Sequence, residues 1–234
     1  MMDTITLALV IGGVTLSVGL AGIGASIGQR MAASASSLLM SDKPERFGIS
    51  LILTVIVETS AIYGLLISIL ILVRLGNVTD FNQGLAALAA GLSVGISGFF
   101  TGLGEGVAAS ASVGAVAERE GVFGRTLVIT VLPETGAIYG LLLSVLILSG
   151  SGFLGEVKAP LEQVGVASMY SAIVISITSI CSFLQGRVGS SAITATTKND
   201  EAFGRDLIFV VLLESVLIYG LLVSILILNF NGVI

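Results

Sequence analysis

Three apolar segments of the chain align with one another without a gap, and each carries one glutamate at the same place. They read RFGISLILTVIVETSAIYGLLISILIL from Arg46, VFGRTLVITVLPETGAIYGLLLSVLIL from Val122 and AFGRDLIFVVLLESVLIYGLLVSILIL from Ala202. In each, the glutamate lies 11 residues after the Phe of a Phe-Gly pair, and Tyr-Gly begins five residues after the glutamate. A helix of about 26 residues is about 39 Å long, more than the roughly 30 Å apolar core of a bilayer. The repeat therefore predicts three membrane-spanning helices of one design.

The composition supports a membrane location. Hydrophobic residues make up 55% of the chain and charged residues 11%, and the mean hydropathy is +1.08. A soluble domain has about 25% charged residues, so this chain lacks the charge to cover a soluble globule. The net charge of −5 includes no basic run, so we expect no nucleic-acid partner. There is also no histidine, the usual proton shuttle and metal ligand at neutral pH.

Upstream of each glutamate-bearing segment lies another apolar segment, richer in Gly, Ala and Ser. These segments cover approximately residues 4–40, 81–116 and 159–196, and include GLAGIGASIG and GLSVGISGFFTGLGEG. Small residues let helix backbones approach one another closely in lipid. The sequence thus predicts an all-α membrane protein with six transmembrane helices, as three tandem helical hairpins over residues 1–76, 77–152 and 153–234.

The basic residues predict an orientation in the membrane. The side with the hairpin turns holds Lys43, Arg46, Arg119, Arg125, Lys198 and Arg205, and the opposite side holds Arg74 and Lys158. The positive-inside rule then puts the hairpin turns in the cytoplasm and both termini outside. We expect a multi-pass protein of a prokaryotic cell membrane, without a cleaved signal peptide.

The three glutamates, Glu58, Glu134 and Glu214, fall near the middle of their spans. An ionisable side chain in a membrane helix is costly, and such residues mark ion or proton pathways. The alternative is a hydrogen bond from a protonated glutamate that only holds helices together. That alternative gives no reason for three copies in one register, so we predict that the glutamates carry an ion.

Hydroxyl side chains lie on another face of each glutamate-bearing helix. Thr135 and Tyr139 share a face, with Leu132 on the same side, whereas Glu134 points about 100° away from Thr135. The arrangement recurs with Thr59 and Tyr63, and with Ser215 and Tyr219. If such helices stand side by side in a closed ring, each glutamate meets the hydroxyl pair of its neighbour. We expect Glu58 to meet the pair Ser215 and Tyr219 of a second copy.

A polar residue of the small-residue segment lies 29 positions before each glutamate: Gln29, Glu105 and Gln185. The motif AASAS at 32–36 and again at 108–112 supports this alignment. Allowing for the turn, the two residues of each pair fall at similar depth, so an oxygen of the inner residue should face the carboxylate. Carboxylate, amide, hydroxyl and backbone-carbonyl oxygens make a cage for a hard cation. One carboxylate per site favours a monovalent ion over a divalent one, and the additional oxygens favour Na⁺, because a proton would need only the glutamate.

The middle hairpin differs from the other two. Glu105 replaces glutamine, so two carboxylates would repel one another unless they share a proton. Pro133 lacks an amide hydrogen and frees the carbonyl of Ile129, so we expect a loosened helix in the middle outer segment only. No broken helix is expected elsewhere.

At these residues the chain resembles the proteolipid family of rotary ATPases, which includes the membrane rotor subunits K and c of V-type and A-type ATPases. PETGAIYG and its two variants, the Gly-rich segments and the short polar turns carry the resemblance over nearly the whole chain. It implies a double-layered rotor ring of identical subunits, driven by ATP hydrolysis in the cytoplasm, whose outer-helix glutamates carry Na⁺ or H⁺. It also implies that Gln29, Gln185, Thr59, Thr135 and Ser215 bind the ion, while Tyr63, Tyr139 and Tyr219 steady the glutamates.

The resemblance implies partners and shows departures from the family pattern. The partners are a stator membrane subunit with an arginine opposite the glutamate, a central-stalk subunit on the cytoplasmic side, and lipid. Familiar V-type subunits have two hairpins and one active glutamate, whereas each of the three hairpins here has its own. Ser60, Gly136 and Val216 stand where some V-type sodium sites have a second glutamine, which leaves the number of ion ligands open.

We interpret the chain as a Na⁺-carrying rotor subunit, coupled to ATP hydrolysis or synthesis elsewhere in the complex, with no ATP site and no catalytic residue of its own. One alternative is the same rotor carrying H⁺. Another is a secondary transporter built of repeats, against which the sequence offers no broken helices and no substrate-sized loop. A structural pore lining would leave the three matched residue pairs unexplained.

Overall fold

The computed structural model describes residues 3–234, and six long helical spans in that range are apolar enough to cross a membrane. The inner spans, rich in small residues, are α1 (Thr4–Asp42), α4 (Phe81–Glu118) and α7 (Leu161–Thr178) continued by α8 (Ile180–Lys198). The outer spans, which carry the glutamates, are α2 (Phe47–Val55) with α3 (Thr59–Val73), α5 (Phe123–Val131) with α6 (Glu134–Gly150), and α9 (Ala202–Leu212) with α10 (Glu214–Phe230). The described residues include no strand. The prediction of an all-α membrane protein with three helical hairpins is confirmed.

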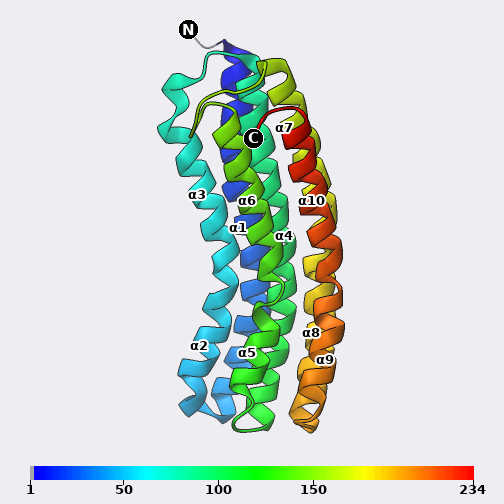
Figure 1. Cartoon of the computed structure of the whole chain (residues 1–234). Helices are drawn as coiled ribbons and strands as arrows, with labels where there is room; N and C mark the ends of the chain where they lie inside the picture. The colour runs from blue at the N-terminus through cyan, green and yellow to red at the C-terminus, as the bar shows by residue number, and fades with distance from the viewer. Residues whose placement is uncertain (1–2) are drawn as a thin grey trace.

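The six spans form two layers (Figure 1). The outer helices α3, α6 and α10 stand side by side in front of α1, α4 and α7. The three hairpin turns lie at one end of the bundle, and the connections between hairpins lie at the other end, together with both ends of the chain. Successive hairpins therefore stand parallel, and each can offer the same face to the next.

Local sequence signals set the ends of the first two inner helices. The Asp3 carboxylate caps α1 by accepting the N–H of Thr6 at 2.7 Å. Asp80 caps α4 and forms a reciprocal capping box with Gln83. Gly121 follows α4 with φ at 81°, a backbone conformation that only glycine adopts readily, so the turn reverses the chain sharply.

Glycines bring the inner helices into backbone contact. A Cβ added to Gly28 of α1 would overlap the carbonyl oxygen of Gly102 on α4. In the same way, a Cβ added to Gly104 of α4 would overlap the carbonyl oxygen of Ser182 on α8. Close packing of this kind is the main attraction between helices in lipid, where there is no hydrophobic force to bring them together.

Gly28→Ala is expected to lower the thermal unfolding temperature of the detergent-solubilised protein. The new methyl group must push α1 away from α4, and overpacking of this kind costs about 1–3 kcal/mol. Gly48→Ala is the control, because Gly48 is exposed and has nothing within 4 Å of an added Cβ. There alanine should be neutral or stabilising by up to about 1 kcal/mol. Circular dichroism during heating measures both; equal changes in the two variants would contradict close α1–α4 packing.

Each outer span is interrupted at its glutamate, although its backbone stays helical in dihedral angle. In the first hairpin a 3₁₀ turn, η2 (Ile56–Glu58), separates α2 from α3. In the other two, α6 and α10 begin at Glu134 and Glu214, after breaks at Leu132–Pro133 and Leu213. The prediction that only the middle outer helix is loosened was wrong, as was the expectation of no other broken helix.

The interruption is shared by all three hairpins, so Pro133 alone does not account for it, and the same side-chain hydrogen bond lies beside each break. The hydroxyl group of the residue after each glutamate donates to the carbonyl oxygen three residues before it. Side-chain hydrogen bonds of this kind compete with the main-chain pattern of a helix. The three bonds are Thr59 to Ile56 at 3.0 Å, Thr135 to Leu132 at 3.1 Å and Ser215 to Leu212 at 2.9 Å.

Basic residues join each hairpin turn to the next one along the chain. Lys43, the last cap residue of α1, donates to the carbonyl of Ala117 at 2.8 Å. Arg119, which caps α4 in the same way, donates to the carbonyl of Thr197 at 3.3 Å. A cation near the C-terminal carbonyls of a helix is favourable because that end carries partial negative charge. The same type of contact therefore joins the first turn to the second and the second turn to the third.

Ion pairs reinforce these links between the turns. Arg46 pairs with Glu120, and both Arg119 and Arg125 pair with Asp200. The hydrogen bond from Arg119, with the positive charges of both arginines, lowers the pKa of the Asp200 carboxyl from its usual value. Because the folded-state pKa is lowered, the stabilisation is present at neutral pH and is lost as the pH falls through that pKa.

Candidate functional site

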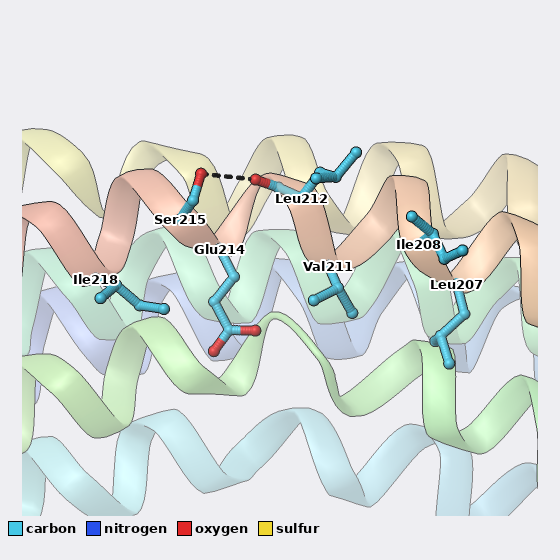
Figure 2. A pocket seen from close by; sticks show the side chains of 7 residues that line it. All are labelled: Leu207, Ile208, Val211, Leu212, Glu214, Ser215 and Ile218. Carbon is cyan, nitrogen blue, oxygen red and sulfur yellow. Dashed lines mark hydrogen bonds between the residues drawn. The ribbon is translucent and has the colours of Figure 1, made fainter.

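The clearest site surrounds Glu214. The hydroxyl group of Tyr139, on the outer helix of the preceding hairpin, donates to Glu214 Oε1 at 2.9 Å. Figure 2 shows the Glu214 side chain extending toward the ribbon of α5 and α6, while Ser215 projects away from that ribbon. The two neighbouring residues of α10 thus point to opposite sides of the helix. Glu214 faces the preceding hairpin, and Ser215 points away from it.

Gln185 of α8 places a free oxygen in the buried interior of the third hairpin. Its side chain is fully buried, and its Nε2 donates to the carbonyl of Val210 at 3.2 Å, one helical turn before Glu214. Its Oε1 has no hydrogen-bond partner among the described residues. A buried acceptor without a partner costs about 1–3 kcal/mol. A bound cation would satisfy this oxygen.

The middle hairpin repeats the site with two acids. The hydroxyl group of Tyr63 donates to Glu134 Oε1 at 2.7 Å, as Tyr139 does to Glu214. Glu105 of α4 is fully buried, neither of its oxygens has a partner in the described chain, and it is close enough to Glu134 for their charges to repel. Two such carboxyl groups need a proton, a cation or both between them.

The first hairpin holds only part of a site. Glu58 is exposed, and within residues 3–234 its one recorded side-chain hydrogen bond comes from Gln29 Nε2 at 3.3 Å. No tyrosine of the described chain donates to it. At the other side of the bundle Tyr219 is 62% exposed, and the described residues include no hydrogen-bond partner for it. The structure therefore brings Glu58 and Gln29 together but leaves Tyr219 and Ser215 far along the row of hairpins.

Each predicted hydroxyl ligand of the outer spans donates to the carbonyl oxygen of the residue three positions before it, at the interruption of the helix. Because Thr59, Thr135 and Ser215 give their protons to carbonyl oxygens, their own lone pairs stay available to a cation. Thr135 and the carbonyl of Leu132 form one such pair of oxygens, one and two helical turns before Tyr139 in the outer span that faces Glu214. The arrangement can hold a small cation through oxygens only.

Sequence reasoning missed two hydroxyl groups near the sites. Ser182 lies one turn before Gln185, is fully buried, and packs against Gly136 without a hydrogen-bond partner in the described chain. Thr101 of α4 donates to the carbonyl of Pro133 at 3.2 Å and so supports the break in the middle outer span. Thr101 has no hydroxyl counterpart in the other hairpins, and Ser182 has one, Ser26, in the first hairpin only, whereas the predicted site residues were singled out by a pattern that occurs three times.

Fold and site together define a class of protein. A double layer of parallel membrane hairpins, with a glutamate at the middle of each outer span and two of the three held by a tyrosine of the preceding hairpin, is the architecture of an ion-carrying proteolipid. The model of the ATP synthase subunit-C family matches the chain three times, over residues 12–71, 88–147 and 164–227. The chain belongs to this family, and the predicted resemblance is confirmed. As a proteolipid it is a multi-pass membrane subunit of an ATPase, not a catalytic one.

Similar proteins include both sodium and proton types. The A-type ATP synthase subunit K of Methanocaldococcus jannaschii is 37% identical over 227 residues, covering 97% of this chain and 98% of that protein. The V-type sodium ATPase subunit K of Enterococcus hirae is 33% identical over 126 residues, 54% of this chain and 81% of that protein. The 16 kDa proteolipid of the human V-type proton ATPase is 29% identical over 125 residues, 53% and 81% of the two chains. These matches leave the ion of this chain open.

Proposed function

We propose that the chain is the rotor-ring subunit of an A/V-type ATPase and that its three glutamates carry Na⁺. The observation that supports sodium is the unpartnered, fully buried oxygen of Gln185 beside the Glu214 site. A neutral amide oxygen with nothing to accept from is costly in the ion-free state and becomes useful when a cation is bound. Glu214, Gln185, Thr135 and the carbonyl of Leu132 are the proposed ligands, with Tyr139 holding the carboxylate in place.

The second candidate function is the same rotor carrying H⁺, and the middle site favours it. Glu105 and Glu134 form a pair of carboxyl groups without an amide. Such a pair can share a proton, and a human relative is a proton ATPase subunit. In a sodium rotor the same pair holds one proton and one sodium ion, so that all three sites carry the same net charge.

The ring is proposed from the incomplete first site. Tyr63 and Tyr139 each reach the glutamate of the hairpin that follows, so Tyr219 and Ser215 should reach Glu58 of the next copy. Further partners are a stator subunit with an arginine opposite the glutamates and a central-stalk subunit. Both belong with a prokaryotic cell membrane, the hairpin turns on the cytoplasmic side and the termini outside.

The mechanism follows from charge. A glutamate with its bound cation is neutral and can face lipid. At the stator the arginine attracts the carboxylate, the ion leaves, and rotation brings the next loaded site in. An empty, charged site cannot turn into lipid, because a carboxylate at the centre of a bilayer costs at least ~2.5 kcal/mol.

Binding of radioactive ²²Na⁺ to the detergent-purified ring tests the choice of ion. Binding should saturate, approaching one ion per glutamate, and unlabelled Na⁺ should displace it. K⁺ at the same concentration should displace far less, because a cage of fixed oxygens selects by ion size. Absence of saturable binding in a ring that still takes up protons would replace the sodium proposal with the proton rotor.

Tyr219→Phe tests completion of the first site by a neighbouring copy. Losing a hydrogen bond to a carboxylate of about 1.5 kcal/mol should raise the Na⁺ concentration that half-protects Glu58 from a carboxyl-reactive carbodiimide by about 10-fold. Mass spectrometry of the labelled peptides follows Glu58 separately from Glu134 and Glu214. Tyr170→Phe is the matched control, since Tyr170 is 61% exposed, Tyr219 is 62% exposed, and Tyr170 is not part of a proposed site. An unchanged Glu58 in an intact ring would rule out Tyr219 as its partner.

A further inference from the structure

The chain contains two junctions between hairpins, and they are built from matching residues. In the inner layer, Gly28 of α1 contacts the backbone of α4 at Gly102 and Gly106. One junction further on, Gly104 of α4 contacts the backbone of α8 at Ser182 and Gly186. Gly28 directly precedes Gln29, as Gly104 directly precedes Glu105. These two junctions show what a contact between successive hairpins looks like.

The third hairpin does not offer the same residue to a next copy. The residue that directly precedes Gln185 is Leu184, which is 43% exposed in the single chain. The first hairpin, which would receive it, presents exposed Ser26 and Arg30 where the internal junctions have Gly102 with Gly106, or Ser182 with Gly186. Arg30 directly follows Gln29, as Gly106 follows Glu105 and Gly186 follows Gln185.

Side chains at these positions cannot fit the spacing of the internal junctions. Even one Cβ at Gly28, Gly104, Gly106 or Gly186 would overlap the backbone of the facing helix. Leucine and arginine in the equivalent places must hold the two inner helices apart. Helix axes pack at about 8–10 Å according to the side chains between them, so the junction between copies should be wider than the two inside the chain.

The outer layer and the hairpin turns differ at this junction too. Asp206 lies three residues after Phe203, where the first two hairpins have the buried hydroxyl residues Ser50 and Thr126 three residues after their Phe. Asp206 lines a hollow of about 310 Å³ between α8 and α9, and its Oδ2 is buried without a partner among the described residues. The residue that caps α8 is neutral Asn199, where Lys43 and Arg119 cap α1 and α4 and reach forward.

We infer that the contact between copies of this chain is a distinct seam, formed by Leu184, Asp206 and Asn199 of one copy and by Ser26 and Arg30 of the next, and that it is wider and weaker than the internal junctions. The inference rests on the proposed ring. The partner at this seam is a second copy of the chain. Within the chain, each of the first two hairpins is covered by the hairpin that follows it, and only another first hairpin can cover the third in the same way. The rotor would then have two close steps and one wide step per chain, and would open first at the seams.

Electron cryomicroscopy of the detergent-purified ring tests the spacing directly. The separation between α8 of one copy and α1 of the next should exceed the α1–α4 and α4–α8 separations, toward the upper end of the range of about 8–10 Å. Equal separations at all junctions would overturn the inference while leaving the ring intact. Failure to find any ring would instead remove the proposed function on which it rests.

A pair of substitutions tests the seam in the other direction. Leu184→Ala with Arg30→Ala should let the copies approach, and should raise the temperature at which the ring separates into single chains by about 2–4 °C or more. Leu142→Ala with Arg74→Ala is the matched control: Leu142 and Leu184 are both 43% exposed, and Arg74 is an exposed arginine at the C-terminal cap of α3, outside the seam residues. A lower separation temperature in the first pair, with the control unchanged, would mean that Leu184 and Arg30 hold the copies together.

Discussion

Replacing Glu214 with glutamine is expected to abolish ATP-driven ion transport by the assembled ATPase, rather than to reduce it by one third. In the proposed mechanism the ring turns as one body, so its sites must pass the stator in succession. Glutamine at position 214 can neither release a cation nor present a negative charge to the stator arginine. Rotation stalls at the first such site, and intact Glu58 and Glu134 sites cannot compensate.

The experiment measures uptake of ²²Na⁺ into sealed vesicles that contain the complete enzyme. We expect at least a 10-fold loss, equal to about 1.4 kcal/mol, with ring assembly unchanged. Glu162→Gln is the control, because Glu162 is an exposed acid in the first turn of α7, outside the sites. Two-thirds of the wild-type rate in the Glu214 variant would show that the sites work independently, as separate pathways of a transporter would.

Sodium is expected to slow the reaction of Glu214 with a carbodiimide at neutral pH, and K⁺ at equal ionic strength should do so much less. The reagent attacks the protonated acid, and a bound cation keeps the carboxylate ionised. General screening acts alike for both salts, so the difference between them reports specific binding. Labelling that follows pH and ignores Na⁺ would make this a proton rotor.

Gln185→Leu should raise the Na⁺ concentration needed for the same protection of Glu214 by ~10-fold or more, if the lost contact is worth about 1.5 kcal/mol. Gln185→Glu keeps an oxygen at this position, as Glu105 does in the middle hairpin, and should retain protection. Gln163→Leu makes the same chemical change at an exposed position of α7 and should have no effect. Unaltered protection in Gln185→Leu would reduce Gln185 to a helix-packing residue.

The residues that could be predicted from sequence are those whose pattern occurs three times. The six spans, the pairing of Gln29 with Glu58 and the reach of Tyr139 toward the next glutamate all follow from periodicity and register. Helix geometry fixes which residues share a face. Because the spacings from Phe to Glu (11 residues) and from Glu to Tyr (five residues) are the same in each outer span, equivalent side chains point in the same direction in all three.

The features that were not predicted depend on which of several nearby hydrogen-bond partners a side chain takes. The hydroxyl groups of Thr59 and Ser215 could have donated to a neighbouring hairpin, yet each donates to a carbonyl oxygen of its own span at the break, with no proline nearby in sequence. The amide of Gln185 likewise chooses the carbonyl of Val210 over the Glu214 carboxylate. A broken outer helix also removes one of the sequence arguments against a transporter; family membership is what decides that question.

The covalent linkage of three hairpins fixes the arithmetic of any ring built from this chain. Each copy brings three outer-span glutamates, so with one ion at each of them the number of ions carried per revolution is a multiple of three whatever the number of copies. A ring that gains or loses one subunit changes its ion count by three, and with it the ratio of ions moved to ATP consumed. A smaller change in the ratio of ions moved to ATP consumed requires a change within the chain itself, such as the loss of one outer-span glutamate.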